Sequence, residues 1–178
     1  MDVSKGSIER ARQHSHLEES RLRYELGSLY QLSYPDESFD AVVCSDVLEH
    51  LLSLPQAAKE IARVLKPGGV FTFDTINRTY FSWYAAILIF QNLIAFVPND
   101  THDWRLFVTP AEVSQLCTGV GLKYSRQNPV GMRPTMRWPW EILPRLYRGR
   151  GWRSFMGEWK LTTSTMASYL SYAVKDRM

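Results

Sequence analysis

The segment Phe39–His50 reads Phe-Asp-Ala-Val-Val-Cys-Ser-Asp-Val-Leu-Glu-His. Its first half, Phe39–Cys44, is nearly all apolar and follows Tyr34–Ser38, a cluster of turn-forming residues. An apolar run that is bounded by turn signals is typical of a strand buried on both faces of a parallel sheet. We therefore expect such a strand at Phe39–Cys44.

The segments on either side of this run alternate between helical and extended patterns. The predicted helices are Gly6–His14, Pro55–Leu65 and Pro110–Val120, and the predicted strands are Leu22–Leu26, Val70–Ile76 and Ser168–Val174. Strand, helix and strand at this spacing predict an α/β fold with a doubly wound sheet.

Two short motifs mark the ends of the predicted helices. Lys66–Gly69 reads Lys-Pro-Gly-Gly, in which the proline disfavours helix before it and the glycines permit a tight turn. Thr109 precedes a proline at the first helical position and Glu112 at the third, which is the pattern of a capping box. These motifs predict a helix end at Leu65 and a helix start at Pro110.

The composition is that of one globular domain. The chain has 178 residues, of which 45% are hydrophobic and 22% charged, with a net charge of +3. These values exclude a disordered polyelectrolyte and give no overall reason to expect nucleic-acid binding. Cys44 and Cys117 cannot form a disulfide framework, and we expect both to be buried, reduced thiols. No signal peptide is expected from the first residues.

The stretch Gly131–Lys160 concentrates basic and aromatic residues. Seven basic residues minus two acidic ones give it a local charge of +5, and it holds four of the six tryptophans. Arginine can pair with anionic phosphates and tryptophan prefers the headgroup region of a bilayer. The stretch is either a membrane-contacting insertion or a solvated surface insertion. No recognition module for nucleic acid accompanies the charge.

A second stretch, Thr79–Asn99, contains no charged residue. Its 21 residues reach the length of a membrane span, but Gln91 and Asn92 interrupt it. We expect an apolar helical segment at residues 79–99 that packs on the sheet or lies in the membrane interface, rather than a true span.

Polar residues follow the predicted strand directly, at Ser45–His50. Ligands of open parallel sheets bind outside the carboxyl ends of the strands. If a helix begins near Asp46, its carboxylate shares a face with Glu49 and His50, and the three side chains can hold a divalent cation. The alternative is an ordinary helix N-terminus with solvated or capping side chains.

Four motifs together resemble a known family. Phe39–His50 and Val64–Gly69 resemble class I S-adenosylmethionine-dependent methyltransferases. Thr75–Thr79 and Val97–Trp104 narrow the resemblance to the O-methyltransferases of ubiquinone biosynthesis, which methylate polyprenylated catechol-type intermediates. The resemblance covers about Asp2 to Gly131 and resumes near Leu161. It implies a Rossmann-like sheet flanked by helices and S-adenosyl-L-methionine as the cofactor.

The resemblance also assigns cofactor contacts. Asp2 falls where the family carries an acidic residue that accepts from the ribose hydroxyls. Ser28 and Leu29 fall where relatives contact the adenine, with Ser28 in place of an acidic residue. Ser45 and Asp46 match positions near the methionine part of the cofactor.

Metal and acceptor contacts follow from the same resemblance. Asp46, Glu49 and His50 match the set that binds magnesium in some family members. His102 is the candidate general base for the acceptor phenol. The alternative is a structural loop residue that hydrogen-bonds Asp100 or Asp103.

The chain departs from the family at its beginning. No Gly-x-Gly precedes Asp2, so we expect a single, partial methyltransferase domain over residues 1–178 that lacks the first strand and its Gly-rich loop. The expected reaction is O-methylation of a polyprenylated aromatic at the cytoplasmic face of a bacterial membrane or at the mitochondrial inner membrane. The alternatives are a catalytically degenerate membrane-associated scaffold and a small-molecule methyltransferase outside quinone biosynthesis. We expect no nucleic-acid partner, and the sequence predicts no oligomeric state.

Overall fold

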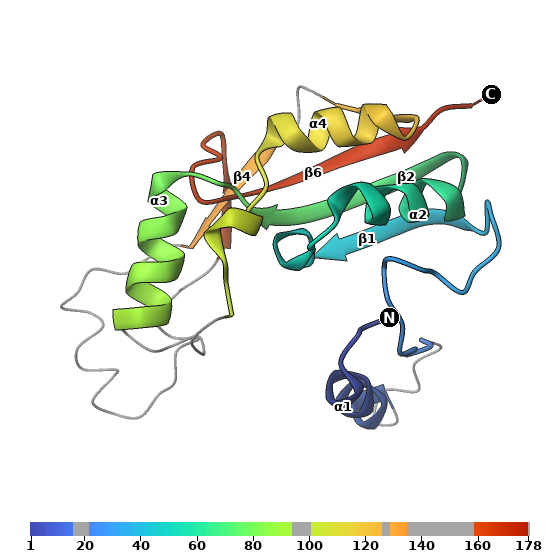
Figure 1. Ribbon diagram of the computed structural model, residues 1–178, viewed down its shortest axis with the longest axis horizontal. Coiled ribbons are helices and arrows are strands. Elements are labelled where there is room, and N and C mark those ends of the chain that lie inside the picture. Colours follow the sequence, from blue (N-terminus) through green and yellow to red (C-terminus); the bar gives the residue numbers. More distant parts are fainter. Residues whose placement is uncertain (16–21, 94–100, 126–128, 135–158, 178) are drawn as a thin grey trace.

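The centre of the protein is a mixed six-stranded sheet (Figure 1), seen in a computed structural model that describes residues 1–15, 22–93, 101–125, 129–134 and 159–177. The strands are β1 (Phe39–Ser45), β2 (Leu65–Ile76), β3 (Leu122–Tyr124), β4 (Val130–Pro134), β5 (Trp159–Thr162) and β6 (Ser168–Lys175). Their order is β1-β2-β6-β4-β5, and β3 also pairs with β6. The expected α/β class is confirmed.

The parallel part of the sheet is a strand–helix–strand unit. Helix α2 (Leu54–Val64) connects β1 to β2, and the two strands run parallel with Ser45 opposite Asp74. Strand β2 begins five residues before the predicted Val70, because Leu65 already pairs with Phe39 ahead of a shift in register. Strand β6 then runs antiparallel to β2. The carboxyl ends of β1 and β2 therefore lie together at one edge of the sheet.

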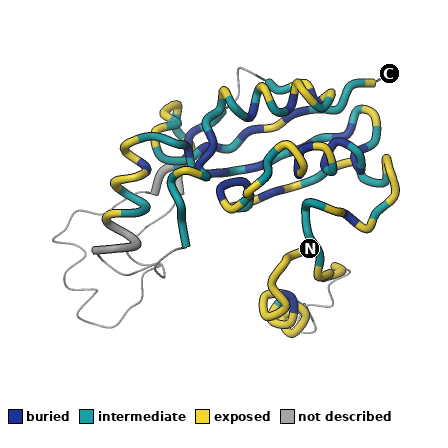
Figure 2. The backbone as a smooth tube through the Cα atoms, viewed as in Figure 1, coloured by how far each residue is buried: buried dark blue, intermediate teal, exposed yellow. Residues whose placement is uncertain are grey.

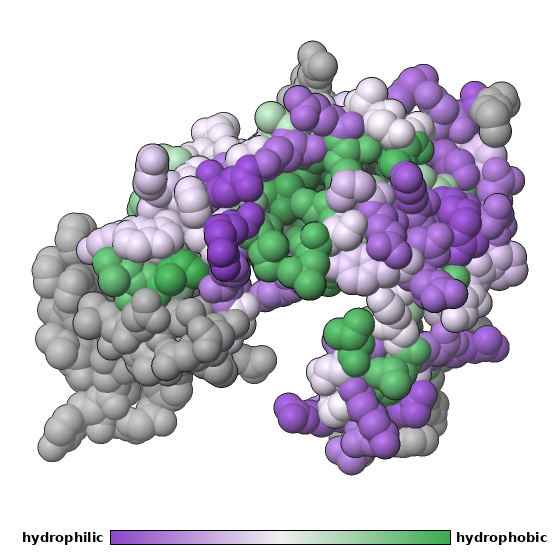
Figure 3. Space-filling model, viewed as in Figure 1, coloured by the Kyte–Doolittle hydropathy of each residue, from purple (hydrophilic) through white to green (hydrophobic). Residues whose placement is uncertain are grey.

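Helices α2 and α4 (Pro110–Gly119) lie side by side on one face of the sheet (Figure 1). Buried and partly buried residues alternate along β2 (Figure 2), and the buried ones include Phe71 and Phe73, which belong to the core that α2 and α4 cover, and Thr75. Hydrophobic side chains gather where the two helices meet (Figure 3). The core beneath α2 and α4 also contains Cys44 and Cys117, which are free, buried thiols as predicted.

The prediction that β1 is buried on both faces is wrong. Among the described residues β1 pairs only with β2, so it is an edge strand of the sheet. Cys44 is buried under the helices, whereas Val43 on the opposite face is 70% exposed. An apolar run shows that a segment is a strand, but it does not show how many neighbours the strand has.

The first residues form a small unit beside the sheet (Figure 1). Helix α1 (Lys5–Ser15) matches the predicted helix. The strand predicted at Leu22–Leu26 is wrong, because only Leu26 pairs, in an isolated parallel bridge to Asp2. A single bridge lacks the ladder of hydrogen bonds that a strand needs.

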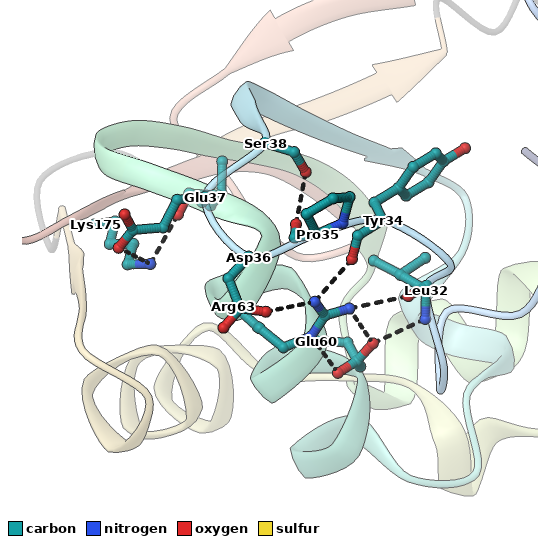
Figure 4. Close-up of polar contacts among 10 residues, drawn as sticks. Leu32, Tyr34, Pro35, Asp36, Glu37, Ser38, Glu60, Arg63 and Lys175 are labelled. Carbon is teal, nitrogen blue, oxygen red and sulfur yellow. Dashed lines mark hydrogen bonds and ion pairs between the residues drawn. The ribbon is translucent and has the colours of Figure 1, made fainter.

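Arg63 of α2 fixes the turn that leads into β1 (Figure 4). Its guanidinium donates to the carbonyl oxygens of Leu32 and Tyr34 at 2.9 and 2.8 Å and pairs with Asp36 and Glu60. Glu60 also accepts from the backbone N–H of Leu32 at 2.8 Å. The loop before β1 is thus tied to the helix that follows it.

The two unusual stretches are described in part. The apolar stretch forms α3 (Tyr80–Ser82), which continues as a π-helix, Trp83–Leu93, while residues 94–99 lie outside the described residues. Over the part of the chain that the structure describes, no helix combines the length and the apolar character needed to cross a membrane. The ends of the basic stretch pair as β4 and β5, and residues 135–158 between them lie outside the described part.

Candidate active site at the carboxyl ends of β1 and β2

Carboxylates gather where β1 and β2 end. Asp46 follows β1 directly and adopts a left-handed conformation, with φ of 50°. Its backbone N–H donates to the Asp74 carboxylate of β2 at 3.2 Å. Partial loss of water around Asp46, and then the negative charge of Asp74, raise the pKa of the Asp46 carboxyl group above its usual value. Each strand end thus contributes one carboxylate to the same place.

The predicted helix does not begin at Asp46. Leu48–His50 is a single 3-10 turn, preceded by Val47, and the left-handed Asp46 stands outside it. The prediction that Asp46, Glu49 and His50 share one face of a helix is therefore wrong. Asp46 and His50 are exposed, whereas Glu49 is only 1% exposed. The alternative of solvated side chains is also wrong for Glu49.

Glu49 is held inside the protein by β2. The hydroxyl of Thr75 donates to its carboxylate at 2.8 Å. Burial, which disfavours the charged form, is the main cause that raises the pKa of Glu49 to about 7, and the charges of Asp46 and Asp74 act in the same direction. Glu49 is thus a carboxyl group that changes protonation state near neutral pH.

The residues predicted to bind magnesium have suitable chemistry, since carboxylates and imidazole are known ligands of divalent cations. Within the described ranges, however, no group of three such side chains is arranged to hold a metal ion. The carboxylate of Glu49 instead accepts its hydrogen bond from Thr75. The structure therefore does not support the predicted magnesium site.

His102 lies at the same edge of the sheet. Its ring stacks on that of His50 with centroids 5.5 Å apart and 23° between the planes, and it lies edge to face with the ring of Phe107, with centroids 6.1 Å apart. Burial, and then the neighbouring His50, lower the pKa of His102 below its usual value. A lowered pKa keeps the imidazole neutral, and therefore able to accept a proton, at neutral pH.

The predicted cofactor residues near the N-terminus also lie close together. Asp2 is exposed, and one of its carboxylate oxygens accepts from the backbone N–H of Ser4 at 2.6 Å. The backbone of Gly27, next to Ser28, donates to the carbonyl oxygen of Asp2 at 3.1 Å. Leu29 packs against the core. Their contacts with a cofactor stay predictions.

Asp74 and Thr75 were not among the predicted site residues. Both lie at the end of β2, the parallel neighbour of β1. The rule that drew attention to Ser45–His50 applies equally to the next strand, because parallel strands bring their carboxyl ends to one edge. The polar Asp-Thr pair after Val70–Phe73 was therefore the available signal.

The chain is similar to known methyltransferases in fold and in part of its sequence. Residues 1–73 match the family described as a methyltransferase domain. A crystal structure of a SAM-dependent methyltransferase from Thermotoga maritima matches with a TM-score of 0.63 and 16% identity, over 98% of this chain and 71% of that one. A crystal structure of a SAM-dependent methyltransferase from Methanosarcina mazei matches with a TM-score of 0.59 and 16% identity, over 98% of this chain and 80% of that one. The chain therefore has the class I methyltransferase fold, and its residues 1–73 resemble the methyltransferase domain family.

Within this class the chain is similar to the ubiquinone biosynthesis O-methyltransferases. It is 34% identical to the human mitochondrial protein of that name, over 90% of this chain and 38% of the relative. It is 31% identical to the protein from Alkalilimnicola ehrlichii, over 97% of this chain and 62% of the relative. The chain thus spans between 38% and 62% of the length of these two relatives.

Proposed function

We propose that this chain transfers a methyl group from S-adenosylmethionine to a hydroxyl group of a polyprenylated aromatic quinone precursor at a membrane surface. The observation that carries the proposal is the position of His102, a half-buried imidazole with a lowered pKa at the carboxyl ends of β1 and β2. The similarity to ubiquinone biosynthesis O-methyltransferases supports the choice of acceptor.

His102 provides the base that the reaction needs. S-adenosylmethionine, when bound, would supply a sulfonium methyl group. The carbon–sulfur bond would break as the carbon–oxygen bond forms, and the electron pair of the broken bond would stay on sulfur. A phenol attacks best as phenolate, so removal of its proton assists the step. The neutral imidazole of His102 takes that proton and orients the acceptor oxygen.

Exposed oxygen atoms fit the cofactor. Asp2, Ser45 and Asp46 are exposed in the described part of the chain, so their side chains are open to a ligand. The Asp2 carboxylate would accept from ribose hydroxyls, and Ser28 and Leu29 would lie at the adenine. Ser45 and Asp46 would hold the methionine part. The carboxylate of Glu49, one of the predicted magnesium ligands, is bonded to Thr75 instead.

The helix that starts at Tyr80 supports contact with a bilayer. Tyr80, Phe81, Trp83 and Tyr84 are all exposed, and Tyr80 reaches 86%. Hydrophobic side chains show on this helix in Figure 3. Aromatic residues of this kind favour the membrane–water interface, where a polyprenyl acceptor resides. We place this surface at the cytoplasmic side of a bacterial membrane or at the mitochondrial inner membrane.

Transfer of a labelled methyl group to a polyprenylated dihydroxybenzoate in anionic vesicles tests the reaction. We expect turnover, and we expect His102→Gln to lower kcat by about 100-fold without changing the KM for the cofactor, because it removes the base. His14→Gln on the exposed face of α1 is the matched control and should keep wild-type kcat. Full turnover in His102→Gln would contradict the assignment.

Vesicle flotation tests the membrane surface. Phe81→Ser and Tyr84→Ser should weaken vesicle binding, whereas Leu22→Ser, at an exposed leucine of the N-terminal unit, should not. Equal turnover of a short, water-soluble acceptor without vesicles would instead indicate a small-molecule methyltransferase. Vesicle binding by a folded chain that neither binds cofactor nor turns over would indicate a scaffold.

A further inference from the structure

The segment that carries His102 is anchored by Trp104. The indole Nε1–H of Trp104 donates to the backbone carbonyl oxygen of Thr79 at 3.1 Å. Its ring also stacks on Tyr80, with centroids 6.2 Å apart and 21° between the planes. One side chain therefore joins the segment at His102 to the start of α3.

Further bonds join the same two segments. Arg78 donates to the carbonyl oxygen of Arg105 at 3.4 Å and forms an ion pair with Glu112 of α4. The backbone N–H of Val108 donates to the carbonyl oxygen of Ile76 at 3.3 Å. The chain from Trp104 to Val108 thus follows residues 76–80 closely.

The residues that receive these bonds are themselves fixed. Thr79 caps α3, since its hydroxyl accepts from the backbone N–H of Ser82 at 3.0 Å, and the same hydroxyl donates to the carbonyl oxygen of Met166 at 2.5 Å. Asn77 is buried and its amide donates to the carbonyl oxygen of Thr165 at 2.8 Å. The segment after β2, to which Trp104 bonds, is therefore held in place by its own hydrogen bonds.

His102 stands two residues before Trp104. The intervening Asp103 holds the turn Trp104–Leu106, since its carboxylate accepts from the backbone N–H of Arg105 at 2.9 Å. A short, hydrogen-bonded connection transmits the position of the indole to the imidazole. The imidazole in turn lies in contact with His50 and Phe107.

We propose that Trp104 is a positioning residue for His102: by bonding to Thr79 and stacking on Tyr80, it holds the imidazole of His102 against His50. Trp104 acts only through His102, and no contact of its own with cofactor or acceptor is proposed. The chemical role of His102 rests on the proposed function. The position in which Trp104 holds His102 does not rest on it.

Histidine NMR of the folded chain tests the placement directly. The rings of His50 and Phe107 shift the ring-proton signals of His102, which is one of four histidines in the chain and is assigned with His102→Gln. Trp104→Phe keeps an aromatic ring but removes the donor, and it should move the His102 signal toward that of an exposed histidine. Tyr80→Leu, which removes only the stacking partner, should move it less. Tyr24→Phe on the N-terminal unit is the control, and an unchanged His102 signal in Trp104→Phe would overturn the proposal.

A double-mutant cycle tests the functional consequence. Trp104→Phe should lower kcat by about 10- to 100-fold with little change in the KM for the cofactor, because misplacement of a catalytic group is costly. In the His102→Gln background the same substitution should cause no further loss. An equal loss in both backgrounds would overturn the proposal. Wild-type kcat in His102→Gln alone would instead contradict the proposed function, and the NMR result would still decide the role of Trp104.

Discussion

Glu49 places a carboxyl group inside the protein, 1% exposed, with the Thr75 hydroxyl as its hydrogen-bond donor. Desolvation penalises its charged form, so the folded state favours the protonated acid more than the unfolded chain does. The residue therefore links folding to pH at the edge of the sheet where we place the reaction.

Glu49 should make the free energy of unfolding depend on pH. With a pKa raised from 4.5 to about 7, its contribution is fully present below pH 4.5 and is lost as the pH rises through 7. The loss should be about 3 kcal/mol, and Glu49→Gln should remove it, because the amide does not ionise. Urea unfolding from pH 4 to 9 measures this. Glu9→Gln on exposed α1 is the control, and a pH dependence in Glu49→Gln equal to that of the wild type would contradict this role of Glu49.

The site residues show what sequence can and cannot predict at this scale. The sequence predicted that Asp46, Glu49 and His50 lie at a ligand-binding edge, because their position after β1 is a local property. It did not predict their arrangement, because the left-handed Asp46 is bonded through its N–H to Asp74, which lies 28 positions along the chain. Contacts between distant residues of this kind cannot be derived from helical spacing.

At the scale of elements, α4 begins as its sequence predicted. The hydroxyl of Thr109 accepts from the backbone N–H of Glu112 at 3.3 Å, and the Glu112 carboxylate accepts from that of Thr109 at 2.9 Å. A capping box involves only four consecutive residues, which explains why it could be predicted. Glu112 also pairs with Arg78, so the cap connects α4 to the support of the His102 segment.

Removal of this cap should destabilise the protein. Thr109→Ala should cost about 1 kcal/mol, because it leaves helix N–H groups without their acceptor, and should lower the Tm by about 2–4 °C. Thr109→Ser keeps the hydroxyl and should stay close to wild type. Thermal unfolding followed by circular dichroism measures both variants. Equal Tm values for Thr109→Ala and wild type would show that the cap does not contribute.

The elements that were predicted wrongly depend on neighbours. Val43 is exposed because β1 has one partner strand in the described sheet, and the number of partners is not encoded in β1 itself. Leu22–Leu26 alternates like a strand, yet only Leu26 finds a partner, in Asp2. By contrast α2 and β6 were predicted to within one residue at each end, and β2 was predicted from Val70 onward but not its first five residues, which include the expected turn at Lys66–Gly69.

At the scale of the whole molecule, the fold brings one set of functional groups to one edge of the sheet. Ser45 ends β1 and lies opposite Asp74 near the end of the parallel strand β2, and His102 reaches the same edge through contacts with His50. The class of fold followed from the strand–helix–strand pattern and from the resemblance. The grouping of His102 with the strand ends required the structure, because His102 lies 52 positions along the chain from His50, the residue on which it stacks.

We propose that this chain binds S-adenosylmethionine as a methyltransferase does, and calorimetric titration of the folded chain with S-adenosylhomocysteine tests this binding. We predict micromolar binding that Asp2→Ala abolishes, because the ribose hydroxyls lose their acceptor, while Glu9→Gln on α1 binds like wild type. Circular dichroism must show that each variant is folded. A folded wild-type chain that does not bind S-adenosylhomocysteine would contradict the claim.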